Sequence, residues 1–289
     1  MRRNHALMKT RFAPSPTGYL HLGHAFSALT AYESARAEGG AFVLRIEDID
    51  QARCRPEYEA TIFEDLAWLG LEWEVPVRRQ SEHFDEYAAA LARLDGIGVL
   101  YPCFCTRKEI AEEVAHAVDA PHCPEGPLYP GTCRALAPEE CAARMRTEPY
   151  ALRIDVAKAA GQLGRPIHFE ERGRGPGGEQ GLRRVQPHLL GDVVLARKGL
   201  PASYHLAVAV DDALQGIELV TRGEDLFPAT HIQRLLQELL DLRVPVYAHH
   251  RLIVDETGKK FSKRNEAATL RALRAAGVTP ADIHRRLGL

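Results

Sequence analysis

The sequence predicts an α/β fold built around a parallel sheet. Strand-like and helix-like patterns alternate between residues 7 and 100, a loop containing glycine and proline separates the first strand from the first helix, and the next strand pattern ends in carboxylates. Such alternation is typical of parallel strands joined by helices. The 289 residues, of which 45% are hydrophobic and 26% charged, are enough for one large domain or two unequal ones.

The first hundred residues show the clearest periodicity. Residues 24–37 have helical periodicity and few helix breakers, and Pro56 is well placed to open a second helix. The elements expected here are, in chain order, a strand over residues 7–13, a helix over 24–37, a strand over 41–50 and helices over 56–71 and 83–100.

The rest of the chain is expected to contain one insertion and then to return to the sheet. Residues 106–150 are rich in cysteine, histidine and proline and have the character of an inserted segment. Residues 173–181, GRGPGGEQG, predict a flexible loop. Residues 191–226 are expected to form strands, residues 230–242 an amphipathic helix, and the end of the chain two short helices.

Charge and hydropathy exclude some classes of protein. No stretch approaches the ~20 apolar residues of a membrane span, and the N-terminus lacks the apolar region of a secretory signal, so a cytoplasmic protein without membrane attachment is expected. The net charge of −2 gives no general argument for nucleic-acid binding. Residues 251–289 nevertheless hold nine lysines and arginines against four acidic residues, which suits either phosphate binding or a solvated helix face.

The loop between the first strand and the first helix is the first candidate site. Its sequence, PSPTGYLHLGH, ends in His21, Gly23 and His24. A loop that leads into a helix presents backbone N–H groups and the positive helix end to an anion, and Gly23 leaves room for a flat ring. On spacing alone, His21 and His24 suit phosphate binding, a metal pair or a simple helix cap.

A basic loop near the C-terminus is the second candidate. Residues 258–264, GKKFSKR, place four cations and a serine beside a glycine. Lysine is a suitable point-charge partner for pyrophosphate, whereas a run of this kind is more often a solvated loop.

Together the two loops resemble the HIGH and KMSKS signatures of class I aminoacyl-tRNA synthetases. RFAPSPTG, LRIEDID, YHLAVAVDD and VTRGEDL look like the glutamyl-tRNA synthetase subgroup, and the resemblance runs from about Lys9 to Lys263. It implies a Rossmann-type catalytic domain that binds ATP with Mg²⁺ and lets an amino-acid carboxylate attack the α-phosphate. It implies a catalytic domain over residues 1–102 and 151–245, an inserted zinc-binding subdomain over 103–150, and the KMSKS-type loop with a short helical segment over 246–289.

The resemblance also implies roles for individual residues. His21 and His24 would stabilise the α-phosphate and Lys263 the departing pyrophosphate, with ATP bound through His21, Gly23, His24, Lys260, Ser262 and Lys263. L-Glutamate would be bound by Arg11, Phe12, Ala13, Pro14, Ser15, Glu47, Tyr204 and Arg222. Glu47 would take the ammonium group and Arg11, Tyr204 and Arg222 the carboxylates, although without the resemblance Glu47 could be an ordinary strand-end carboxylate. A pair of arginines would also reject glutamine, whose amide leaves buried charge unpaired.

Six cysteines are present, and several of them lie close together in the expected insertion. In a chain with no export signal, such a cluster favours metal binding over disulfides. The family resemblance implies a structural zinc site made by Cys103, Cys105, Tyr129 and Cys133. The spacing is longer than expected, which makes His116, His122 and Cys123 rival ligands, and buried free thiols remain the alternative.

Only 25 residues follow Arg264, so no anticodon-binding domain is expected. The resemblance therefore narrows to a truncated branch of the family, which attaches glutamate to queuosine in the anticodon stem-loop of tRNA(Asp). A monomer is expected. The alternatives are a minimal glutamyl-tRNA synthetase that charges a tRNA 3′ end, another nucleotide transferase with a similar loop, and a non-catalytic RNA-binding paralogue.

Overall fold

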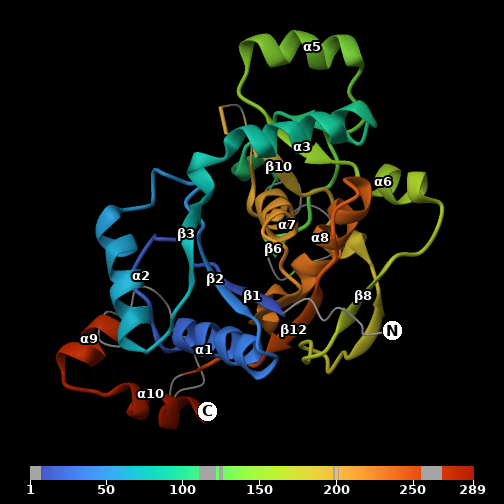
Figure 1. The fold of residues 1–289 in the computed structure, drawn as a ribbon. Helices are drawn as coiled ribbons and strands as arrows, with labels where there is room; N and C mark the ends of the chain where they lie inside the picture. Colours follow the sequence, from blue (N-terminus) through green and yellow to red (C-terminus); the bar gives the residue numbers. More distant parts are fainter. Residues whose placement is uncertain (1–7, 111–121, 124–125, 198, 201, 255–268) are drawn as a thin grey trace.

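The computed structural model describes residues 8–110, 122–123, 126–197, 199–200, 202–254 and 269–289, and its centre is a seven-stranded sheet (Figure 1). The strand order is β3-β2-β1-β11-β12-β8-β9. All neighbours are parallel except β9, which pairs antiparallel with β8. The strands are β1 (Lys9–Phe12), β2 (Ala41–Ile46), β3 (Glu74–Arg79), β8 (His168–Glu171), β9 (Gly181–Arg184), β11 (Leu219–Gly223) and β12 (Val246–His250). The predicted α/β fold with a parallel sheet is confirmed.

A separate hydrophobic core lies on each face of this sheet. The first core includes residues of α1 (Leu22–Ala37), α2 (Pro56–Trp68), α9 (Leu270–Ala275) and α10 (Pro280–Leu287). The second includes residues of α3 (Phe84–Gly96), α6 (Val156–Leu163), α7 (Tyr204–Leu214) and α8 (Phe227–Leu239). Because side chains alternate along a strand, Phe42 and Leu44 of β2 enter the first core and Val43 the second.

The prediction of strands throughout residues 191–226 is wrong for α7. Its residues His205–Asp212 are all buried, so the segment shows neither the period of an amphipathic helix nor the alternation of a half-buried strand. A short apolar run containing valines therefore resembles a buried strand although it forms a helix. Within the part of the chain that the structure describes, neither α7 nor any other helix is long and apolar enough to cross a membrane.

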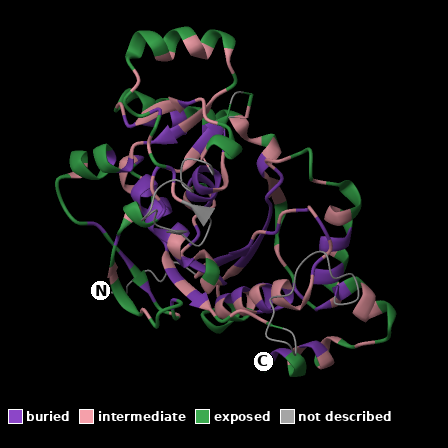
Figure 2. Ribbon diagram, turned by 180° about the vertical axis from the view of Figure 1, so that it is seen from behind, coloured by how far each residue is buried: buried purple, intermediate pink, exposed green. Residues whose placement is uncertain are grey.

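A second, smaller sheet brackets the cysteine-containing segment. It contains β4 (Leu100–Cys103), β7 (Ala151–Ile154) and β10 (Val194–Arg197) in the antiparallel order β10-β7-β4. Between β4 and β7 lie the β5–β6 hairpin (His122–Cys123 and Gly126–Pro127) and α5 (Pro138–Thr147). No residue of α5 is buried, and the helix lies at the periphery of the molecule (Figures 1 and 2), where the Arg144 guanidinium carbon is 4.2 Å from the centre of the Phe104 ring.

The order of the strands creates a crevice at one point of the main sheet. From β1 the chain proceeds to β2 and β3 on one side, whereas β11 and β12 lie on the other. At such a switch point the connections leave the carboxyl ends of neighbouring strands in opposite directions, and ligands of α/β proteins bind there. We therefore expect a ligand-binding site at the carboxyl ends of β1 and β11.

Asp65 of α2 is a buried carboxylate whose charge opposes folding. It is fully buried, and neither of its oxygens accepts a hydrogen bond in the described structure, although Arg274 of α9 lies 3.5 Å away. Burial raises the pKa of Asp65 to about 6 despite the attraction of Arg274. The folded state therefore prefers protonated Asp65. This contribution to stability is fully present below pH 3.8, the ordinary pKa of the side chain, and is lost as pH rises through about 6.

The Asp65→Asn variant should therefore become more stable than the wild type as pH rises. We expect similar melting temperatures near pH 4.5 and an advantage for the variant of roughly 2–6 °C at pH 7.5, because the variant has no buried charge to desolvate. Thermal unfolding across this pH range checks the prediction. A difference between the two proteins that does not change with pH would contradict it.

Candidate active site

A cavity of about 650 Å³ lies at the carboxyl ends of β1, β11 and β12. All the residues expected to bind glutamate line it, namely Arg11, Phe12, Ala13, Pro14, Ser15, Glu47, Tyr204 and Arg222. His21, Gly23 and His24 line the same cavity. Lys260, Ser262 and Lys263 lie outside the described residues.

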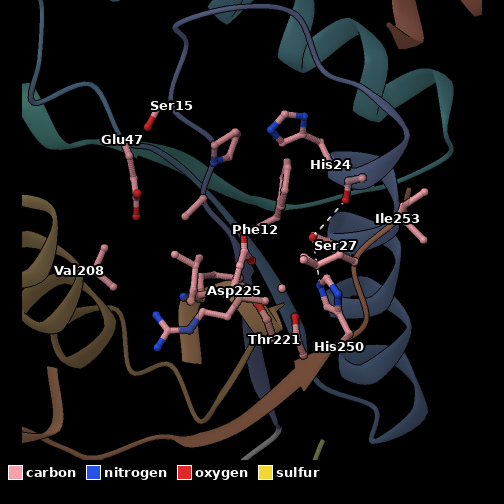
Figure 3. A pocket seen from close by; sticks show the side chains of 18 of the residues that line it. Phe12, Ser15, His24, Ser27, Glu47, Val208, Thr221, Asp225, His250 and Ile253 are labelled. Atoms are coloured by element: carbon pink, nitrogen blue, oxygen red, sulfur yellow. Dashed lines mark hydrogen bonds between the residues drawn. The ribbon is translucent and has the colours of Figure 1, made fainter. Parts of the chain in front are cut away.

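The cavity has two ends that differ in chemistry (Figure 3). Ser15 and Glu47 lie at one end, whereas His24, Ser27 and His250 lie at the other (Figure 3). Ser27 Oγ is 3.0 Å from His250 Nε2, which connects α1 to the end of β12. An amino acid and a nucleotide could thus occupy opposite ends of one cavity.

His21 and His24 form the N-terminal cap of α1. His21 is the N-cap residue, and its Nδ1 accepts a hydrogen bond from Gly23 N at 3.1 Å. His24 Nδ1 accepts one from His21 N at 3.2 Å, which completes a capping box. Because Nδ1 is the acceptor in both rings, each neutral imidazole carries its proton on Nε2. The helix-cap alternative is therefore present in the structure, and it leaves each ring with a donor at Nε2.

Gly23 has a local role in this cap. A Cβ atom at this position would lie 3.1 Å from Cε1 of the His21 ring, closer than most real Cβ contacts. The glycine therefore gives the His21 side chain room to fold back over the first turn of α1.

The residues that flank positions 255–268 lie beside the cavity. Ile253 lines it directly. On the other flank, Thr269 forms an antiparallel β-bridge with His21, and Leu270 N donates to Leu20 O at 2.8 Å. Both flanks of the KKFSKR segment are thus adjacent to the loop that contains His21.

A buried network of charges forms the floor beneath Arg11 and Glu47. Asp212 of α7 accepts hydrogen bonds from Arg11 Nε at 3.1 Å and from Arg45 Nη1 at 2.8 Å. Arg45 is fully buried and also donates to Glu47 Oε1 at 3.1 Å. Burial alone would raise the pKa of Asp212, but the two arginines outweigh burial and hold the pKa below its usual range. The network fixes two of the expected glutamate-binding side chains in relation to each other.

Glu47 itself is in a different electrostatic state. Burial raises the pKa of Glu47 above its usual range, although Arg45 and Arg11 attract the ionised form. A cationic ligand at this end of the cavity would favour the ionised carboxylate.

Arg222 is buried among neutral partners. Its exposed fraction is 5%, and it donates to Gln233 Oε1 at 2.8 Å, Thr230 Oγ1 at 2.6 Å and His249 Nε2 at 3.1 Å. A longer contact of 3.4 Å joins it to Tyr204 Oη. Among the described residues, no carboxylate forms an ion pair with Arg222, in contrast to Arg11. A buried guanidinium in this state favours an anionic ligand.

Several residues of this site are absent from the sequence-based set. They are Arg45, Asp212, Thr230, Gln233 and His249. A signal for Arg45 was available, because residues two apart on a strand face the same side and Arg45 precedes Glu47 by two. Thr230 and Gln233 are three apart on the predicted helix and therefore share a face. Asp212 and His249 had no such local signal, since only the fold brings them to the site.

The cysteine cluster has the geometry of a metal site. The Sγ atoms of Cys103, Cys105 and Cys133 all lie within 4.8 Å of one another, with Cys105 and Cys133 3.5 Å apart. Tyr129 Oη is 3.6 Å from Cys105 Sγ. Tetrahedral zinc with Zn–S bonds of about 2.3 Å places its sulfur ligands about 3.8 Å apart, so this donor set fits. Phe104 N also donates to Cys133 Sγ at 3.4 Å, which would favour a thiolate there.

The contacts above do not include the three rival zinc ligands predicted from the sequence. His116 lies outside the described residues, and for His122 and Cys123 only the backbone of β5 is described. Cys54 and Cys141 have no place in the cluster of described thiols.

Comparisons with known proteins place the chain in a family of tRNA synthetases. The model for the catalytic domain of class I tRNA synthetases (E and Q) matches residues 7–289. The glutamyl-Q tRNA(Asp) synthetase of Rhodobacter capsulatus is 50% identical over 288 residues, which cover 98% of this chain and 100% of that protein. The glutamate–tRNA ligase of Aquifex aeolicus is 41% identical, over 94% of this chain and 55% of the ligase.

A solved structure is similar over most of this chain as well. The glutamate–tRNA synthetase of Elizabethkingia anophelis superposes with a TM-score of 0.72 and 32% identity, over 89% of this chain. The chain spans about half of that synthetase, 52% of its length. On these matches, the chain belongs to the class I glutamyl- and glutaminyl-tRNA synthetase family, and within it to the glutamyl-Q tRNA(Asp) synthetase branch.

Proposed function

We propose that this protein activates L-glutamate with ATP and transfers the glutamyl group to queuosine in the anticodon of tRNA(Asp). The activation of glutamate is supported above all by the buried Arg222, which has neutral partners in a cavity that also contains Arg11 and Glu47. The transfer to queuosine is supported by the Rhodobacter capsulatus relative, which this chain covers over its whole length and whose name states the tRNA and the modified base.

Glutamate would bind with its three charges opposite those of the cavity. Arg222 would receive one carboxylate and Arg11 would face the other, while the ammonium group would lie at Glu47 and favour its ionised form. Ser15 and Tyr204 would add hydroxyl groups, and Phe12, Ala13 and Pro14 the backbone wall. Glutamine would be rejected, because its neutral amide would leave a buried arginine without an anion.

Activation needs positioned positive charge more than a base. A carboxylate oxygen of glutamate attacks the α-phosphorus of ATP, the bond from that phosphorus to the bridging oxygen breaks, and pyrophosphate leaves. The attacking carboxylate is already ionised at neutral pH, so no proton is removed. The Nε2–H groups of His21 and His24 would donate to the α-phosphate oxygens as their charge grows.

The pyrophosphate would be held by the basic segment whose flanks lie at the cavity. Lys263, Lys260 and Ser262 are the residues proposed for this role, and the β-bridge between Thr269 and His21 supports it. Gly23 would leave space beside the adenosine. Mg²⁺ would enter with ATP through phosphate oxygens and water, and would supply charge neutralisation there.

A second cavity of about 450 Å³ supports the transfer step. It shares Ser15, Glu47, Tyr204 and His205 with the first cavity. Its other walls include polar side chains such as Asp50, Arg53 and Gln80. An acceptor nucleoside there would place a ring hydroxyl near the glutamyl-adenylate. The hydroxyl oxygen would attack the acyl carbon, the bond from that carbon to the phosphate oxygen would break, and AMP would leave with the hydroxyl proton passing to its phosphate or to water. Unstacked bases of an RNA loop, such as the anticodon loop, are suitable for such a cavity.

The decisive experiment is glutamate transfer to tRNA(Asp) with and without queuosine. With ATP and radiolabelled glutamate, we expect stoichiometric labelling of tRNA(Asp) that contains queuosine and background labelling of the same tRNA from cells that lack it. Equal labelling of both tRNAs at the 3′ end would favour the minimal glutamyl-tRNA synthetase instead.

We also propose that Cys103, Cys105, Tyr129 and Cys133 hold one structural zinc ion. The four donors would close a tetrahedral site, and none of them lines the active-site cavity, so that the ion would stabilise the segment between β4 and β7. A closed site of this kind contributes to folding and not to catalysis.

Purified protein should therefore contain about one zinc ion per chain, by elemental analysis. Cys133→Ser should lower the zinc content to well below half and reduce the melting temperature, because a three-donor site binds zinc weakly. Cys141→Ser is the matched control, since Cys141 lies outside the cluster, and it should keep both zinc and stability. Full zinc in the Cys133 variant would argue for one of the rival ligands.

A further inference from the structure

Three buried side chains form a line across three adjacent strands. Glu171 lies on β8, His249 on β12 and Arg222 on β11, and Arg222 and His249 are direct neighbours in the strand register. Their exposed fractions are 1%, 3% and 5%. Glu171 Oε2 lies 2.6 Å from His249 Nδ1, and Arg222 Nε donates to His249 Nε2 at 3.1 Å.

The directions of these hydrogen bonds are determined by the backbone. Glu171 Oε1 accepts from the backbone N–H groups of His249 and Gly173, both at 2.8 Å. The other oxygen, Oε2, must accept from Nδ1–H of His249, because an ionised carboxylate has no proton to donate. Nε2 of a neutral His249 then carries a lone pair, which receives Nε–H of Arg222.

The charge state of each partner agrees with this scheme. Burial lowers the pKa of His249 to about 4, although its hydrogen bond to Glu171 opposes the change. Burial alone would raise the pKa of Glu171, but the hydrogen bonds from His249 hold it below its usual range. At neutral pH the line thus consists of a carboxylate, a neutral imidazole and a guanidinium.

From this geometry we infer that Glu171 and His249 are positioning residues for glutamate recognition. Glu171 fixes the tautomer of His249, and His249 fixes the plane of the Arg222 guanidinium by accepting its Nε–H. Thr230 and Gln233 then hold the two terminal nitrogens, so that the guanidinium presents one orientation to a carboxylate in the cavity. The inference rests on the proposed function and extends it to residues that do not line the cavity.

The Glu171→Gln variant isolates this effect because it changes almost no volume. The two backbone N–H groups require an oxygen at the Oε1 position, so the new amide N–H₂ must face His249 Nδ1. Nδ1 then becomes the acceptor, the ring proton moves to Nε2, and Nε2–H faces Nε–H of Arg222. Two donors in this contact repel each other, and the guanidinium loses its orientation.

We expect Glu171→Gln to raise the KM for glutamate at least tenfold in glutamate-dependent ATP–pyrophosphate exchange, with the KM for ATP unchanged within twofold. Asp192→Asn is the matched control, because Asp192 is also a buried carboxylate, and it accepts hydrogen bonds from Tyr101 of β4, from Arg134 and from the backbone N of Val156 in α6. It should alter the melting temperature without a selective change in the KM for glutamate. An unchanged KM for glutamate in Glu171→Gln would overturn the inference, as would an equal rise in both KM values.

A double variant tests the tautomer argument in particular. In His249→Gln the side-chain oxygen can reach the position of Nε2 and accept a hydrogen bond from Arg222. It can do so whether residue 171 accepts a hydrogen bond, as glutamate does, or donates one, as glutamine does. Adding His249→Gln to Glu171→Gln should therefore restore part of the lost affinity for glutamate, and a double variant no better than Glu171→Gln would contradict the argument. If the wild type itself showed no glutamate-dependent exchange, the result would refute the proposed function. If the wild type showed exchange and the variants behaved otherwise than expected, only the inference about Glu171 and His249 would be refuted.

Discussion

A buried guanidinium that has no anionic partner among the described residues is the constraint on which the rest of the site depends. Arg11 and Arg45 share Asp212, and Arg45 also forms ion pairs with Glu47 and Asp211, so each of these arginines has an anionic partner within the protein. Arg222 instead has neutral partners among the described residues, and a buried uncompensated charge costs several kcal/mol. The free protein therefore keeps a site that an anion would stabilise, and under the proposed function a carboxylate of glutamate would satisfy that requirement.

The topology of the sheet explains why this charge can be held at all. Arg222 is the penultimate residue of β11 and lines the cavity at the switch point between β1 and β11. Behind it, His249 of the neighbouring strand and Thr230 and Gln233 of α8 supply acceptors for its N–H groups. The same edge of the sheet leads into α1, whose capping histidines line the other end of the cavity. Amino-acid and nucleotide chemistry thus meet because neighbouring strands end at one edge.

Much of the fold and part of the site could be predicted from the sequence. Before residue 100 the patterns predicted β1, β2 and α1–α3 but missed β3, a strand with no buried residue. The motifs identified Arg11, Glu47 and Arg222, which are up to about 210 positions apart and meet only in the fold. The strand prediction for α7 was wrong because a wholly buried helix has no periodicity to detect. Asp212 and His249 could not be found, since their roles arise from contacts across the fold and not from local spacing.

The affinity of the free protein for L-glutamate compared with L-glutamine is the most direct test of this account. Isothermal titration calorimetry at neutral pH and low salt measures both without ATP or RNA. We expect glutamate to bind at least about tenfold more tightly, a difference of roughly 1.4 kcal/mol or more, because only glutamate brings a second anion to the buried arginines. Equal affinity for the two amino acids, or tighter binding of glutamine, would contradict it.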